Sequence, residues 1–262
     1  MIYAIPYYFL IPFFLCWGSF LNVLAYRLIQ SKSIIRPRST CPKCQTLIAW
    51  YDNIPVFSWL FLQGKCRNCR KSISPLYPCI EIITTIALIL LYTNISLHYF
   101  FGYFIFFSAL IVTIRSDIET MLISRYATVF LAPCGFLMSV YGFIPLSPRE
   151  SICGAFFGYF FLFSINVIFK YWRNIDGIGE GDFDLLFFIG SFTGIIGCWI
   201  SITIGSLFGS IYGIINLLIA PYNQNYHNAI NITKIPFGPF LAFGALIFTF
   251  IQRYVFHYML MQ

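Results

Sequence analysis

The sequence predicts an all-α polytopic membrane protein with about eight transmembrane helices and a small cytoplasmic loop module that binds zinc through four cysteines. Hydrophobic residues make up 59% of the 262 positions and charged residues only 10%, whereas soluble domains carry about 25% charged residues. The mean hydropathy is +0.80, and apolar stretches close to the roughly 20 residues that cross a bilayer recur along the chain. The 31 Phe and 18 Tyr suit lipid-facing and interfacial positions. One short basic run in an otherwise apolar chain excludes nucleic-acid binding.

Eight apolar segments are the expected transmembrane helices. The third and sixth are short or interrupted by glycine, and the sixth and seventh adjoin with little polar sequence between them, so seven helices remain an alternative. The first segment is expected to be retained, because no basic region precedes it and no small-x-small cleavage site follows it. The segments are Tyr3–Leu24, Cys79–Leu97, Phe100–Ile114, Tyr126–Phe143, Ile152–Trp172, Leu185–Trp199, Ile200–Ile219 and Phe237–His257.

The distribution of positive charge predicts how these helices are oriented. Loops rich in Lys and Arg stay in the cytoplasm. If the N-terminus is periplasmic, fourteen of the sixteen Lys and Arg residues fall in the inner segments 25–78, 115–125, 170–184 and 220–236. We therefore expect three parts: a first transmembrane helix over 1–24, a cytoplasmic module over 25–78 and a helix bundle over 79–262.

Four of the nine cysteines form two CxxC pairs in the cytoplasmic module. They are Cys41, Cys44, Cys66 and Cys69, with 21 residues between the two pairs. Two such pairs predict a tetrahedral zinc site with four thiolate ligands, which is structural because it leaves no open position for a catalytic water. A metal would also stabilise a loop too short of apolar sequence to build its own core. Free thiols and disulfides are the alternatives, although disulfides are rare in the cytoplasm.

Two aspartates, Asp117 and Asp182, are the candidate catalytic residues. Each lies at the edge of an apolar segment, where a carboxylate is costly and therefore indicates function, and the predicted orientation places both on the cytoplasmic side. Two carboxylates in contact share a proton, so one can polarise a scissile carbonyl while the other activates water. Helix capping is the alternative for Asp182, which lies in Gly179-Glu-Gly-Asp182. The nearby acids Glu119, Glu180 and Asp184 are rivals that the pattern leaves open.

Several short motifs occur in one order along nearly the whole chain. With them, the sequence resembles the bacterial type IV prepilin leader peptidases, which are membrane aspartic proteases of the GxGD type. The motifs include Gly18-Ser-Phe-Leu-Asn22, the two CxxC pairs, Trp50-Tyr-Asp-Asn-Ile-Pro55, Tyr77-Pro78 with Glu81, Asp117-Ile-Glu-Thr-Met-Leu-Ile, Gly179-Glu-Gly-Asp182-Phe and Ile235-Pro-Phe-Gly238-Pro.

The resemblance implies an enzyme of the inner membrane that serves type IV pili or type II secretion. It would cut the basic leader of prepilins or pseudopilins after a glycine at the cytoplasmic face, with Asp117 and Asp182 as catalytic residues. It also implies that the new N-terminus is methylated with S-adenosylmethionine. The cofactor site is not visible in the sequence; Asn22, Arg27 and the pair Asp52-Asn53 are plausible contacts to substrate or cofactor.

The sequence departs from the family pattern at two positions. The first aspartate motif usually ends in Leu/Ile-Pro-Asp, but here reads Ile123-Ser124-Arg125. The second is usually followed by Phe-Lys, but here by Phe183-Asp184. We expect Asp184 to place a further acid beside the dyad, where it raises the pKa of the dyad or helps to attract a basic leader.

Two other functions compete with the peptidase. An ion-coupled transporter would also use acidic residues and glycine-broken helices, but its acids usually lie near the membrane midplane. A non-catalytic assembly factor stabilised by zinc would not cut a leader peptide in detergent.

Overall fold

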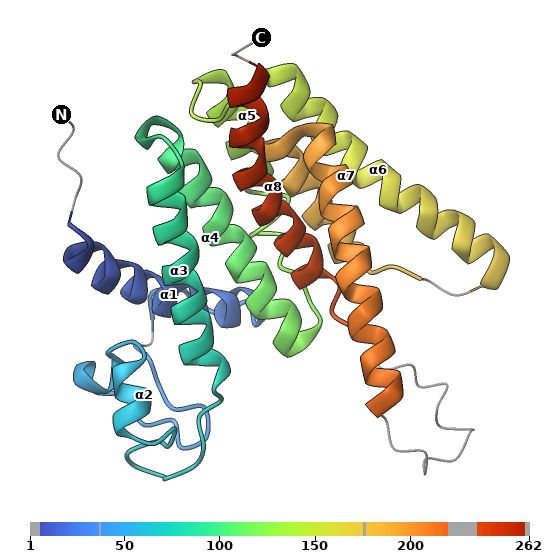
Figure 1. The fold of residues 1–262 in the computed structure, drawn as a ribbon. Helices are drawn as coiled ribbons and strands as arrows, with labels where there is room; N and C mark the ends of the chain where they lie inside the picture. The colour runs from blue at the N-terminus through green and yellow to red at the C-terminus, as the bar shows by residue number, and fades with distance from the viewer. Residues whose placement is uncertain (1–5, 37, 175–176, 220–234, 260–262) are drawn as a thin grey trace. The chain divides into compact units, whose positions relative to one another are not determined.

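The computed structural model describes residues 6–36, 38–174, 177–219 and 235–259, with side chains as far as residue 252. This part of the chain is all-helical, and it divides into two compact units, 1–116 and 117–262. Figure 1 shows the elements: α1 Tyr7–Ile29, the 3-10 helix η1 Trp50–Asn53, α2 Phe57–Phe61, α3 Leu76–Asn94, α4 Leu97–Thr120, α5 Ala132–Val140, α6 Pro148–Arg173, α7 Glu180–Ile219 and α8 Gly238–Met259.

The first unit is built on the pairing of α1 with α3. Gly18 of α1 lies against the backbone of Glu81 in α3, where a Cβ atom would come within 2.9 Å of the Glu81 Cα. At the end of this unit the guanidinium of Arg115 is buried in α4. It lies over the Tyr77 ring at 5.0 Å, and its Nε donates to Asn22 Oδ1 at 3.0 Å. These contacts connect the ends of α1 and α4 to the start of α3.

The second unit is centred on α7, which packs against α5, α6 and α8. Helix α6 begins with Pro148 after a capping box, in which Ser147 Oγ accepts from the Glu150 amide and the Glu150 carboxylate accepts from the Ser147 amide. Gly154 of α6 and Gly190 of α7 face each other so closely that a Cβ on either would meet the backbone of the other. Small residues allow such close packing where two membrane helices share no hydrophobic driving force.

Within the described residues, five helices are long and apolar enough to cross a membrane, namely α1, α3, α4, α6 and α7, and the apolar segment Gly238–Gln252 of α8 is shorter. The prediction of a multi-pass helical membrane protein is therefore confirmed, whereas the count of eight spans stays a prediction. The expected span at 126–143 contains the nine-residue helix α5, preceded by turns. The expected cytoplasmic segment at 220–236 lies outside the described residues, apart from its last two.

The sixth and seventh expected spans form the 40-residue element α7, which is interrupted at Gly194. Gly194 has φ 70° and ψ −171°, a conformation that essentially only glycine adopts. The helical stretches on either side of it therefore differ in direction. Hydropathy located the apolar sequence but placed the division at residue 199 instead of residue 194.

Candidate active site and metal centre

Asp117 is held by the start of α8. It lies three residues before the end of α4, is 5% exposed, and its Oδ2 accepts a hydrogen bond from the Gly238 amide at 3.0 Å. Gly238 is the first residue of α8, and the N-terminus of a helix presents unpaired N–H groups and a partial positive charge to an anion. A Cβ at position 238 would come within 2.8 Å of Asp117 Oδ2, so this contact requires glycine.

Asp182 lies in the first turn of α7, in the same unit as Asp117. Its amide donates to the Gly179 carbonyl at 3.1 Å, and its carboxylate interacts electrostatically with that of Asp117. Ile123 packs against the backbone at two places, Gly181 beside Asp182 and Gly238 at the start of α8. A Cβ at Gly181 would come within 2.9 Å of the Ile123 Cβ, and one at Gly238 within 3.0 Å of its Cδ1. The backbone beside Asp182 and the start of α8, which holds Asp117, thus both pack against Ile123.

Asn166 of α6 fixes the segment that leads into α7. Its Oδ1 accepts from the amides of Gly177 and Ile178, at 3.0 and 3.1 Å. Sequence analysis did not identify Asn166 or Gly238 as functional residues. A polar side chain inside the apolar segment 152–172 was the available signal for Asn166, whereas a backbone donor such as the Gly238 amide has no side-chain signature.

Arg125 forms ion pairs with two acids that lie on either side of Asp182, namely Glu180 and Asp184. Its Nε donates to Asp184 Oδ2 at 3.0 Å, and its Nη2 donates to Glu180 Oε2 at 3.3 Å. The Asp184 side chain is only 9% exposed, compared with 65% for Arg125 and 84% for Glu180. Asp184 is therefore paired with Arg125, and the expectation that it raises the pKa of the dyad or helps to attract a basic leader stays a prediction. The two departures from the family pattern form one ion pair.

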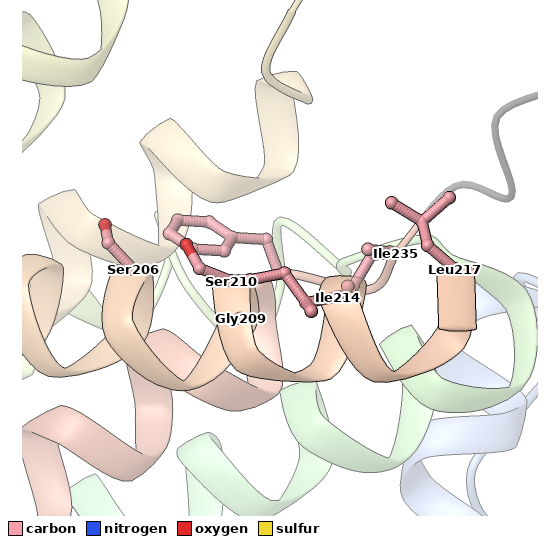
Figure 2. A pocket seen from close by; sticks show the side chains of 8 residues that line it. Ser206, Gly209, Ser210, Ile214, Leu217 and Ile235 are labelled. Carbon is pink, nitrogen blue, oxygen red and sulfur yellow. The ribbon is translucent and has the colours of Figure 1, made fainter. Parts of the chain in front are cut away.

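A mostly apolar groove of about 490 Å³ runs along one face of α7 and the residues that lead into α8 (Figure 2). Phe237 lines this groove, and the next residue, Gly238, donates the hydrogen bond to Asp117. The groove therefore lies directly beside the backbone that supports Asp117. The lining residues are Ser206, Gly209, Ser210, Gly213, Ile214, Leu217, Ile235 and Phe237.

The four cysteines form one cluster in the first unit. Their Sγ atoms all lie within 4.8 Å of one another. The Sγ–Sγ distances are 3.9 Å for Cys41 and Cys69 and 4.0 Å for Cys44 and Cys66. A zinc ion with four Zn–S bonds of about 2.3 Å holds its sulfurs roughly 3.8 Å apart. The cluster therefore has the dimensions of a tetrahedral metal site.

Two similar hairpins present these thiols. In each hairpin the amide of the first cysteine donates a hydrogen bond across the bend: Cys41 donates to the Thr46 carbonyl at 3.0 Å, and Cys66 donates to that of Lys71 at 2.9 Å. The residue after the second cysteine has a φ of 57° in both hairpins. Hydrogen bonds from Thr46 lower the pKa of the Cys44 thiol to about 6, whereas desolvation and the neighbouring thiols raise the pKa of Cys69 to about 11. Without a cation, the thiols of the cluster therefore differ in how readily they become the thiolates that a metal requires.

The residues considered for substrate or cofactor contact have internal partners. Besides its bond with Arg115, Asn22 donates to the Tyr77 carbonyl at 3.1 Å. Arg27 donates to the carbonyls of Ser33 and Ile34 at 3.0 and 2.7 Å. Asp52 accepts two hydrogen bonds from Arg67, the shorter at 2.6 Å. These contacts stabilise the first unit, and Asn53 remains an exposed neighbour of Asp52.

The fold and the site define a multi-pass membrane protein with paired carboxylates and a cysteine module, and comparison with known proteins supplies its family. Residues 13–95 match the bacterial peptidase A24 N-terminal domain, and residues 104–214 match the type IV leader peptidase family. The chain is 30% identical to the prepilin leader peptidase/N-methyltransferase of Aeromonas salmonicida (strain A449), over 90% of this chain and 87% of that protein. It is 33% identical to that of Pectobacterium carotovorum subsp. carotovorum, over 87% of each chain.

A third relative, the prepilin leader peptidase/N-methyltransferase of Pseudomonas aeruginosa, is 30% identical over 88% of this chain and 85% of its own length. Among solved structures, none matches the chain. The full-length relatives show that the chain belongs to the type IV leader peptidase family.

Proposed function

We propose that Asp117 and Asp182 are the catalytic dyad of a prepilin leader peptidase. The observation that carries this proposal is that two acids from distant parts of the sequence interact at the ends of two helices within one unit. The acids of an ion-coupled carrier usually lie near the membrane midplane. Asp117 instead lies in the last turn of α4, and Asp182 in the first turn of α7.

The dyad acts as a general acid and a general base on one water molecule. One carboxyl group donates its proton to the scissile carbonyl oxygen, while the other takes a proton from the water that attacks the carbonyl carbon. The protonated partner then gives a proton to the amide nitrogen as the C–N bond breaks. Because the two groups share protons, each titration step belongs to the pair, and the roles are not assigned to single residues. The Gly238 amide orients the Asp117 carboxylate throughout.

The substrate class follows from the family. The chain acts on prepilins or pseudopilins, whose basic leader is removed at the cytoplasmic face while their apolar helix stays in the membrane. The enzyme is accordingly placed in the bacterial inner membrane, with about eight spans and a periplasmic N-terminus. Its parts are the first helix at 1–24, the cysteine module at 25–78 and the peptidase bundle at 79–262. Methylation of the new N-terminus with S-adenosylmethionine is the second activity in the names of the relatives.

Zinc is the metal that fits the cysteine cluster best. Four thiolates at tetrahedral spacing match a structural zinc site, and Cys41, Cys44, Cys66 and Cys69 would hold the ion. The metal would stabilise the module between α1 and α3 and would supply no catalytic position, since all four ligands come from the protein.

Cleavage by purified protein tests the dyad. Asp117→Asn and Asp182→Asn are expected to abolish removal of a prepilin leader in detergent, while membrane insertion and metal content stay unchanged. The matched controls are Glu119→Gln and Glu180→Gln, which remove charge from exposed neighbours and should leave most of the activity. Mass analysis of the product gives the cleavage position and any added methyl group. A dyad variant that still processes the prepilin would contradict the assignment.

A further inference from the structure

The cysteine module exposes an apolar face on α2. We propose that this face, made by Phe57, Leu60 and Phe61 of α2, inserts into the interface of the bilayer, and that the basic residues in and directly before the second cysteine hairpin bind anionic lipid headgroups. The proposal depends only on contacts within the first unit, so it stands or falls separately from the peptidase dyad.

The depth of α2 follows from its attachment to a membrane span. The amide of Val56, the residue before α2, donates to Glu81 Oε2 at 2.8 Å, and Glu81 is buried in α3. Helix α3 begins at Leu76, so Glu81 lies about 7.5 Å along it at 1.5 Å per residue. Val56 has a φ of 60°, which a β-branched residue rarely adopts. The contact with Glu81 therefore holds α2 beside the first turns of a transmembrane helix, and not out in the cytoplasm.

The exposed face of α2 is apolar, and it does not point into the module. Helical spacing places positions 57, 60 and 61 on one side, where Phe57, Leu60 and Phe61 are 55%, 58% and 85% exposed. Trp59 occupies the opposite side, with its Nε1 donating to the Ile73 carbonyl at 3.2 Å and its ring against Gly64. The module thus uses Trp59 for its own packing. A short amphipathic element with such a face is stabilised when it lies in the membrane interface.

The charge of the module complements an anionic surface. Residues 25–78 contain nine Lys and Arg residues and a single acid, Asp52, and Asp52 is paired with Arg67. Lys and Arg close to a membrane surface attract anionic lipids. Exposed basic residues lie in the second cysteine hairpin and directly before it; they are Lys65, Arg67, Arg70 and Lys71. Depth, apolar face and charge together favour the lipid interface over a protein partner.

Photocrosslinking in a bilayer tests the proposal. Full-length protein carries benzoylphenylalanine in place of Phe61 and is reconstituted in nanodiscs of phosphatidylglycerol and phosphatidylcholine. The control carries the same group in place of Lys43, at the exposed tip of the first cysteine hairpin. We expect lipid adducts at position 61 in several-fold excess over position 43, and a lower yield at 61 when phosphatidylglycerol is omitted.

Three outcomes would overturn the proposal: equal adduct yields at the two positions, adducts at position 61 to protein, or a yield that does not depend on phosphatidylglycerol. Metal content and cleavage activity are measured on both labelled proteins, so that misfolding is recognised. The same probe at Leu60 replaces the one at Phe61 if the latter prevents folding.

Discussion

The ion pair between Arg125 and Asp184 supports the segment that carries Asp182, the second acid of the proposed dyad, and its removal should reduce activity without touching the dyad. Arg125→Ala leaves the Asp184 carboxylate, with 9% exposure, without its guanidinium donor. A hydrogen bond to a charged group contributes about 1.5–3 kcal/mol. Because Arg125 itself is 65% exposed, solvent replaces part of the contact, and the lower end of this range applies. The exposed contact with Glu180 adds less than about 1 kcal/mol.

If this loss of roughly 1.5 kcal/mol appears in full as lost stabilisation of the transition state, kcat/KM decreases by slightly more than about tenfold. We expect this decrease for Arg125→Ala and for Asp184→Ala in a prepilin cleavage assay with purified protein. The charge-reversed pair, Arg125→Asp with Asp184→Arg, restores opposite charges and should recover activity well above either reversed single variant. The coupling between the two positions is then obtained from the double-mutant cycle.

Additive effects in this cycle would refute the argument that the two side chains act as a pair. The competing view, in which Asp184 attracts a basic leader, makes a different prediction. Asp184→Asn would then raise KM mainly for leaders rich in Lys and Arg, and reversing the charge at Arg125 would not restore activity. Comparing a basic leader with a neutralised leader separates the two views.

Three further variants test two residues that support the candidate dyad and one ligand of the candidate metal site. Gly238→Ala should lower cleavage by tenfold or more, because its Cβ would collide with the first carboxylate at 2.8 Å; Gly209→Ala, where a Cβ has ordinary contacts at 3.6 Å, should retain activity. Asn166→Ala should reduce cleavage because two amides lose their acceptor, and Asn166→Asp should recover part of it; equal losses would exclude a role for the side-chain oxygen. Cys66→Ser should lower metal content from about one zinc per chain in elemental analysis, whereas Cys153→Ser should not; protein purified without chelators but lacking metal would count against the site.

The sequence predicted the long helices well because the bilayer imposes one strong requirement, a run of about 20 apolar residues. Helices α1, α3, α4 and α6 fall within a few residues of the expected segments. Hydropathy could not predict the break at Gly194, since a glycine in an apolar run is common and only tertiary contacts decide which one bends. It also could not predict that 126–131 forms turns before α5, because apolar side chains are compatible with helix and turn alike.

The sequence predicted the acidic and thiol side chains of the candidate sites, but it did not predict the contacts that support them. The acids and the thiols are chemically distinctive and could be identified one by one. The supporting roles of Gly238, Asn166 and Ile123 depend on distance in space, so neither the motifs that contain Gly238 and Ile123 nor the polar character of Asn166 could predict them. Arg125 and Asp184 were each noticed as departures from the family, but only their proximity shows that the two opposite charges compensate each other.

The placement of Arg125 is also compatible with the proposed proton-sharing pair of Asp117 and Asp182. A cation bound directly to either catalytic carboxylate would favour its ionised form and oppose proton sharing. Among the ion pairs that the described residues form, none includes Asp117 or Asp182; Arg125 binds Asp184 and Glu180 instead. The dipoles at two helix N-termini stabilise negative charge on the dyad, because Asp117 accepts a hydrogen bond from the first amide of α8 and Asp182 lies in the first turn of α7. Helix N-termini offset part of the cost of burying charge while leaving the shared proton exchangeable, which the proposed acid–base mechanism requires.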